Sequence, residues 1–124
     1  MTELNSGAVT RCNVGSSGLS QCSTAGTGFN EPVSLIVSGS VAYESDQGSG
    51  QIFRCSIDPA GVLTGCTGLT VPNSSLTSEL AINGSTLYMI AASAPNLVRC
   101  SIGAAGALYG CVNDTIPFSG SAIA

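Results

Sequence analysis

The side chains best able to do chemistry in this chain are six cysteines, which fall into three pairs of nearly equal spacing. An arginine stands directly before the first cysteine of each pair, and these three arginines are the only basic residues in the sequence. The three groups are Arg11 with Cys12 and Cys22, Arg54 with Cys55 and Cys66, and Arg99 with Cys100 and Cys111. Paired cysteines can form disulfides, hold a metal ion, or remain as buried free thiols.

The spacing favours disulfides and disfavours zinc. Nine or ten residues separate the cysteines of a pair, which is wider than the roughly two to four of a zinc knuckle, and the chain has no histidine. Folding about a turn between the two cysteines would place them on facing antiparallel strands, where Cα atoms lie about 4.5–5.5 Å apart. We therefore expect three disulfides and an extracytoplasmic protein (secreted, periplasmic or cell-surface), with six buried free thiols as the alternative.

Other catalytic chemistry finds little support in the sequence. A serine nucleophile needs a base, and the chain has neither histidine nor lysine. The seven acidic residues are scattered, and Glu44 with Asp46 provides too few ligands for Ca²⁺, which takes about six to eight oxygens. We expect no enzymatic activity and no metal or cofactor.

Residues that recur in step with the cysteines are better explained by structure than by ligand binding. Arg11, Arg54 and Arg99 are expected to cover their own repeats or to pair with nearby carboxylates. Tyr43 and Tyr88 occupy equivalent positions and are expected to be packing residues on the second strand of their repeats.

Three asparagines match the acceptor pattern for N-glycosylation. They are Asn73, Asn83 and Asn113. Such matches arise often by chance in a chain rich in Ser and Thr, and the sequence leaves open whether any of them is modified. Asn83 is better explained by the hairpin turn that Asn83-Gly84 favours.

The cysteine pairs mark a repeat that covers the chain. Successive copies begin 43 and 45 residues apart (12 to 55, 55 to 100), and a period of about 40–50 residues is typical of repeat architectures. Each full copy predicts four short strands and no capped helical stripe. The expected strands are 33–37, 41–44, 51–57 and 62–66, then 79–82, 86–90, 96–102 and 107–111. Asp58-Pro59-Ala60-Gly61 is strong turn chemistry between the last two strands of the middle copy.

Four antiparallel strands in about 44 residues are typical of a propeller blade. The pattern Arg-Cys-Ser-Ile, Gly-x-Leu-x-x-Cys, a Pro, and an Ile-Asn-Gly-Ser-x-x-Tyr hairpin resembles bacterial β-propeller repeats of the YVTN and NHL-like kind. The resemblance covers essentially the whole chain. It implies an all-β propeller fold, and members of such families are secreted or surface proteins and binding scaffolds, with some enzymes.

We expect one repeat domain of about three blades in permuted phase. The expected parts are a partial blade at 1–28, blades at 29–72 and 73–113, and the start of a further blade at 114–124. Residues 2–5 align with the end of a second strand, and residues 118–124 align with the innermost strand of a blade. Three blades are too few to close a propeller, which usually has about four to eight.

The expected function is that of a non-enzymatic structural or interaction module, with a propeller that binds a glycan or small molecule as the alternative. The expected partner is a second copy, joined head to tail as a closed ring or a filament, or the remaining blades of a longer chain. The formal net charge of −4 and the separated arginines disfavour nucleic acid. No apolar run is long enough for a membrane span, and the first residues lack the basic and apolar regions of a signal peptide.

Overall fold

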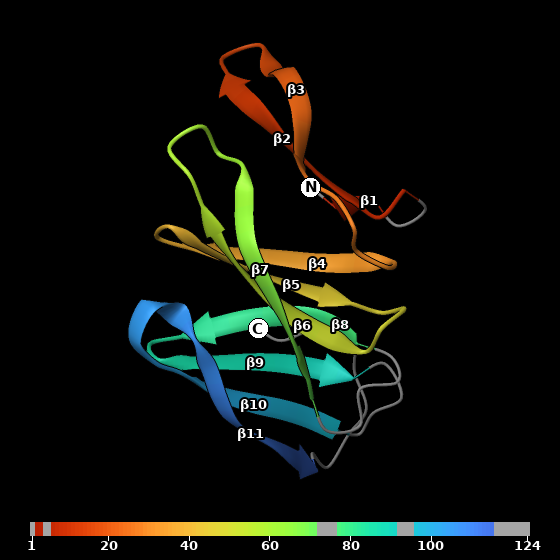
Figure 1. The fold of residues 1–124 in the computed structure, drawn as a ribbon, viewed down its shortest axis with the longest axis vertical. Coiled ribbons are helices and arrows are strands. Elements are labelled where there is room, and N and C mark those ends of the chain that lie inside the picture. Colours follow the sequence, from red (N-terminus) through yellow and green to blue (C-terminus); the bar gives the residue numbers. More distant parts are fainter. Residues whose placement is uncertain (1, 4–5, 72–76, 92–95, 116–124) are drawn as a thin grey trace.

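Three antiparallel sheets make up the fold in the computed structural model, which describes residues 2–3, 6–71, 77–91 and 96–115 (Figure 1). The first sheet contains β1 (Thr2–Glu3), β2 (Ala8–Gly15) and β3 (Gly18–Gly26). The second contains β4 (Pro32–Ser38), β5 (Val41–Asp46), β6 (Gln51–Ile57) and β7 (Leu63–Thr70). The third contains β8 (Thr77–Asn83), β9 (Thr86–Ala91), β10 (Asn96–Ile102) and β11 (Leu108–Thr115). The all-β prediction is confirmed, and these ranges contain no α-helix.

Strands follow one another in each sheet in chain order, so each sheet is a meander. β6 and β10 have the bounds expected from their alternating residues. β7 and β11 extend past the expected ends at residues 66 and 111, because pairing with the preceding strand continues beyond the second cysteine. The short β1 pairs Thr2 with Val9, as Ser45 pairs with Ile52 in the second sheet. The chain therefore enters the first sheet late in the second strand of the repeat, as its alignment predicted.

A β-bulge interrupts the pairing of the last two strands of every sheet. The register shifts beside the first cysteine of each pair, between Arg11 and Asn13, Arg54 and Ser56, and Arg99 and Ser101. The residue before the second cysteine has positive φ each time: 50° at Gln21, 57° at Gly65 and 60° at Gly110. Such a bulge bends and twists the strand locally, which explains why simple alternation did not predict the full length of the outer strands.

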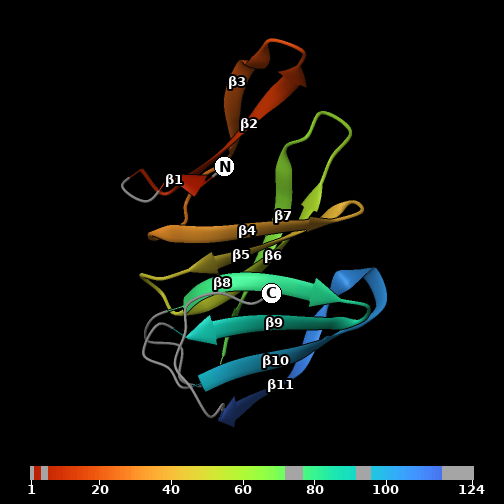
Figure 2. The ribbon, with the colours of Figure 1, turned by 180° about the vertical axis from the view of Figure 1, so that it is seen from behind.

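Each sheet packs with one face against a face of the neighbouring sheet. β4 contacts both β1 and β8, so the inner edges of neighbouring sheets are close together (Figures 1 and 2). One apolar cluster joins the first and second sheets and includes Val9, Ala25, Phe29 and Cys55. A larger cluster joins the second and third sheets; its buried members are Tyr43, Ile52, Val71, Leu87, Met89, Val98 and Cys100.

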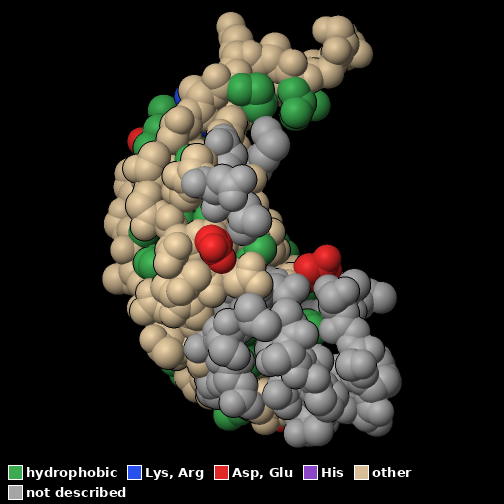
Figure 3. Space-filling model, turned by 90° about the vertical axis from the view of Figure 1, so that its right-hand side faces the viewer, with side chains coloured by type: hydrophobic (Ala, Val, Ile, Leu, Met, Phe, Trp, Pro, Cys, Tyr) green, Lys and Arg blue, Asp and Glu red, His purple; other side chains and the backbone are tan. Residues whose placement is uncertain are grey.

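The stack of sheets is open and curved. Figure 3 shows the body from the side, convex on one flank and hollow on the other. No closed barrel or ring is formed by the described residues. The predicted innermost strand at 118–124 lies outside the described residues, and β11 runs to Thr115, beyond the expected blade end at residue 113. The described part of the chain contains no helix that could cross a membrane.

Candidate functional site

All six cysteines are joined in the pairs expected from their spacing. The bonds Cys12–Cys22, Cys55–Cys66 and Cys100–Cys111 span Cα–Cα distances of 4.1, 4.1 and 4.0 Å. Each bond crosses the bulge between the third and fourth strands of its repeat. Three disulfides within one chain indicate an oxidising environment.

A group of polar contacts links the second sheet to the third. Tyr43 and Arg54 are directly opposite each other on β5 and β6, and both reach the short 3₁₀ turn Ala104–Gly106 between β10 and β11. The Tyr43 hydroxyl donates to the Gly106 carbonyl at 2.6 Å. Arg54 Nε donates to the Ala105 carbonyl at 3.0 Å, and Nη2 donates to the same oxygen. Two side chains of one sheet thus hold the turn of the next.

The chemical states of these two groups suit them to donate. Burial raises the pKa of Tyr43, and the Arg54 guanidinium partly opposes that shift, so the hydroxyl keeps its proton at neutral pH. Arg54 also donates from Nη1 to Ser56 Oγ at 2.7 Å, which fixes the plane of the guanidinium.

A glycine at the point where the turn meets Tyr43 avoids both backbone strain and a close side-chain contact. Gly106 has a φ of 77°, and a Cβ there would lie 2.9 Å from the Tyr43 hydroxyl oxygen. Gly61 occupies the same place in the turn of the second sheet, with a φ of 80°, and a Cβ there would lie 3.0 Å from Arg11 Cδ. Arg11 therefore lies against the turn of the second sheet as Arg54 lies against the turn of the third.

The third arginine has a different partner. Arg99 Nε donates to Asp114 Oδ2 at 2.8 Å, and both side chains are nearly half exposed. The hydrogen bond and charge of Asp114 raise the pKa of Arg99, and the same hydrogen bond lowers the pKa of Asp114. Tyr88 lies opposite Arg99, as Tyr43 lies opposite Arg54. No described sheet follows the third one, so this Tyr–Arg pair has no turn to hold among the described residues.

Sequence reasoning expected the arginines to cover their own repeats or to pair with carboxylates. Arg99 does pair with a carboxylate, whereas Arg54 instead donates to one backbone carbonyl of the following sheet, that of Ala105. Tyr43 packs in the core as expected and in addition donates a hydrogen bond. The sequence did carry a signal for these contacts, since a turn glycine follows one repeat after Arg11 and one repeat after Arg54, at Gly61 and Gly106.

Glu44 and Asp46 are both buried but differ in their surroundings. The Asp46 carboxylate accepts hydrogen bonds from the Asn30 amide at 2.6 Å and from the Ser49 amide and hydroxyl at 2.9 Å. Neither carboxyl oxygen of Glu44 has a hydrogen-bond partner among the described residues. Burial, with a smaller effect from Asp46, raises the pKa of Glu44 to about 8. The described residues contain no group of three or more potential metal ligands.

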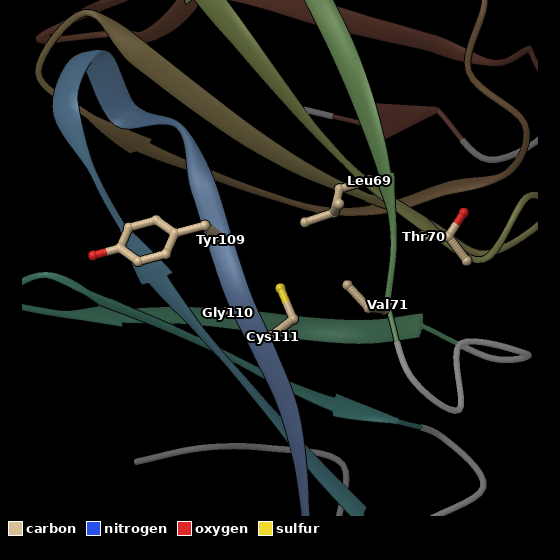
Figure 4. A pocket seen from close by; sticks show the side chains of 6 residues that line it. All are labelled: Leu69, Thr70, Val71, Tyr109, Gly110 and Cys111. Carbon is tan, nitrogen blue, oxygen red and sulfur yellow. The ribbon is translucent and has the colours of Figure 1, made fainter.

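A groove separates the outer strands β7 and β11 of the second and third sheets. Its volume is about 580 Å³, and its lining is Leu69, Thr70, Val71, Tyr109, Gly110 and Cys111. Leu69, Val71 and Cys111 point into the space between the strands, whereas Thr70 and the Tyr109 ring point away from it (Figure 4). A second hollow of about 200 Å³ lies between Arg54 and Leu108. The groove can accept an apolar group, and its walls carry few polar anchors.

Two of the three candidate glycosylation residues lie in the described part of the chain. Asn83 ends β8, and the residues between the strands are Gly84 and Ser85, one position later than the expected Asn83-Gly84 turn. Asn113 lies in β11 with its side-chain oxygen buried. Asn73 lies outside the described residues.

No protein-family model, curated protein or solved structure matches this chain. The resemblance to YVTN and NHL-like repeats therefore rests on the sequence pattern, and functional inference rests on the contacts described above.

Proposed function

We propose that this chain is a non-enzymatic structural or interaction module in which each sheet serves as a blade of an extracytoplasmic β-propeller. The observation that carries the proposal is a repeated sheet-to-sheet contact: Arg11 lies against the turn at Gly61, and Arg54 donates to the Ala105 carbonyl in the turn of the third sheet. A contact that recurs with the repeat belongs to the architecture rather than to a single active site.

The arrangement of strands supports blades. Each full sheet is a four-stranded meander, and the inner strands β4 and β8 are adjacent. The outer strands β7 and β11 leave a groove between them. Sheets that are close at the inner edge and apart at the outer edge fit a radial arrangement. Three such sheets are fewer than the roughly four to eight of known propellers, so further blades would be needed to complete a ring.

The disposition of the reactive groups supports a structural role. All cysteines are in disulfides, two arginines contact neighbouring turns, and Asp46 accepts hydrogen bonds from Asn30 and Ser49. Glu44 is enclosed between sheets, among apolar neighbours. The three disulfides also support a secreted, periplasmic or surface location over the cytoplasm.

A broad hydrolase and lyase screen of the oxidised protein tests the non-enzymatic part of the proposal. No turnover above a heat-denatured control is expected. Turnover that disappears in Glu44→Gln or Asp46→Asn, with the thermal unfolding transition retained, would contradict it.

The groove between β7 and β11 favours a second candidate, a propeller that binds a glycan or other small molecule. Calorimetry and a glycan array with the wild type, Leu69→Arg and Leu19→Arg distinguish the two. Leu69 lines the groove, whereas Leu19 lies in the first sheet, far from it along the stack. Binding that is lost only in Leu69→Arg would replace the purely structural proposal with this one.

A further inference from the structure

Two apolar side chains of the first sheet are exposed where their repeat equivalents are covered. Val14 is 84% exposed and Leu19 is 63% exposed. The residues at the same repeat positions, counted from the cysteines, are only partly exposed: Ile57 and Leu63 in the second sheet, Ile102 and Leu108 in the third. We call Val14, Leu19 and residues 15–18 between them, which include the two-residue turn Ser16-Ser17, the head surface. It lies on the β2–β3 hairpin, which projects from the end of the stack (Figure 1).

The covered equivalents show what the head surface lacks. Leu63 packs on the apolar cluster of the first sheet, around Val9 and Ala25. Leu108 packs on the cluster of the second sheet, around Tyr43 and Ile52. In both cases the leucine is covered by the sheet that comes before its own. No described sheet precedes the first one, so Leu19 remains in solvent.

The cysteines repeat this difference. Cys55 and Cys100 are fully buried at the interface with the preceding sheet. Cys12, at the same repeat position, is only half-buried. The turn, the apolar side chains and the first cysteine are thus all more exposed in the first sheet than in the second and third sheets.

The opposite end of the stack carries the complementary groups. Tyr88, Arg99 and Val112 lie in one row across β9, β10 and β11, and we call them the tail surface. Tyr43, Arg54 and Thr67 form the same row in the second sheet, where Tyr43 and Arg54 hold the turn of the third. Arg99 is 48% exposed and Val112 is 42% exposed.

We propose that the tail surface of one copy of this chain docks onto the head surface of a second copy, repeating the contact between the second and third sheets. Arg99 then donates to carbonyl oxygens of residues 15–18, and Leu19 is buried as Leu63 and Leu108 are. This inference rests on the proposed function, since it treats the sheets as interchangeable blades.

Electrostatics and symmetry are compatible with such a joint. The segment between Val14 and Leu19 is Gly-Ser-Ser-Gly and brings no charge against Arg99. The Arg99–Asp114 pair lies at the surface, where ion pairs are weak and easily exchanged for other donors and acceptors. Because head and tail are different surfaces, the contact is heterologous and generates a ring or a filament.

A mixing experiment tests the joint. Leu19→Asp disables the head and leaves the tail, and Arg99→Glu disables the tail and leaves the head. We expect the wild type to associate with increasing concentration in sedimentation velocity, and each variant alone to remain monomeric, with at least a tenfold weaker self-association. An equimolar mixture of the two variants should form a one-to-one dimer and nothing larger, because each pair has one intact joint.

Val37→Asp is the matched control, since Val37 is a comparably exposed apolar residue on β4, outside both surfaces. It should associate like the wild type. Wild-type thermal unfolding and three intact disulfides by mass confirm the fold of each variant. A mixture that stays monomeric, or a Leu19→Asp variant that still associates, would overturn the joint. Either result leaves the proposed function to be judged by its own substrate screen.

Discussion

Glu44 is a carboxylic acid at a buried position where the repeat equivalent is apolar. Leu35 and Phe53 are its cross-strand neighbours, and both pack in the apolar cluster between the first two sheets. Met89 occupies the same position in the third sheet, where it is fully buried. A carboxyl group there is favoured in its neutral form, because burial penalises the charge and Asp46 repels it.

This environment predicts a pH-dependent stability. The pKa of Glu44 is about 8 in the folded chain, against an ordinary value of 4.5. The folded state therefore binds the Glu44 proton more tightly, so the contribution of Glu44 to the free energy of unfolding is fully present below about pH 4.5 and is lost as the pH rises to about 8. Urea denaturation across this range measures the fall.

Two variants isolate the cause of the pH effect. Glu44→Gln and Glu44→Met both remove the titrating group, and the second installs the side chain found at Met89. Both should flatten the pH profile, and Glu44→Met should be more stable than the wild type at pH 8. A Glu44→Gln protein that keeps the wild-type slope would assign the pH dependence to other groups.

The residue before the second cysteine of each pair adopts the left-handed backbone conformation. Gly65 and Gly110 adopt it without strain, whereas the first repeat has Gln21 there. The Gln21 side chain accepts a hydrogen bond from Asn13 Nδ2 at 2.5 Å, which helps to offset the cost of positive φ. The chain thus keeps the bulge in a repeat that lacks its glycine.

At the scale of elements, the three disulfide-bonded hairpins close loops of similar length, but their cysteines differ in how deeply they are buried. The bonded cysteines are 10 residues apart in the first hairpin and 11 in the other two. Each disulfide should therefore raise the free energy of unfolding by a similar amount through loop closure, about 3 kcal/mol in the chain-entropy model. Cys55 is fully buried, whereas Cys12 is not.

Removing the disulfides pair by pair should reveal that difference. Cys55→Ala with Cys66→Ala should cost about 1–2 kcal/mol more than Cys12→Ala with Cys22→Ala, because it also leaves a cavity between two sheets. Chemical denaturation at concentrations too low for association gives both values. Equal losses would mean that burial of the sulfur adds nothing to the staple.

At the scale of the whole molecule, stability depends on how each sheet holds the next. The Tyr43 hydroxyl crosses from the second sheet to the Gly106 carbonyl of the third. Tyr88 is its repeat equivalent, and the described residues provide no following turn for it. The two tyrosines therefore separate the effect of the sheet-to-sheet bond from that of the residue type.

Tyr43→Phe should lower the free energy of unfolding by about 1–2 kcal/mol, since it leaves the Gly106 carbonyl without that donor. Tyr88→Phe should change the free energy of unfolding of the monomer by well under half of the Tyr43→Phe loss. The urea midpoint of dilute protein measures both. A loss of similar size in both variants would show that the hydroxyl acts within its own sheet.

Local pattern was enough to predict the strands, the order of the meanders and the cysteine pairing. Alternating apolar residues, Asp-Pro-Ala-Gly and Asn-Gly-Ser turns, and the repeated cysteine spacing all act between neighbours along the chain. Strands such as β6 and β10 therefore have the bounds that were predicted. The predicted ends of the outer strands β7 and β11 were wrong, because each strand contains a bulge. A bulge depends on a positive φ at one residue, which an alternation pattern does not reveal.

The sequence by itself determined that this is a three-fold repeat of stapled β-meanders. Only the tertiary structure decided that Arg54 binds a turn 51 residues away. It also decided that Glu44 is buried without a hydrogen-bond partner, at the position that Met89 occupies in the third sheet. Likewise, only the structure shows that Leu19 is exposed to solvent whereas Leu63 packs against the preceding sheet. The reason is physical: strand formation depends on neighbours in the chain, whereas the burial of a given side chain depends on which sheet lies against it.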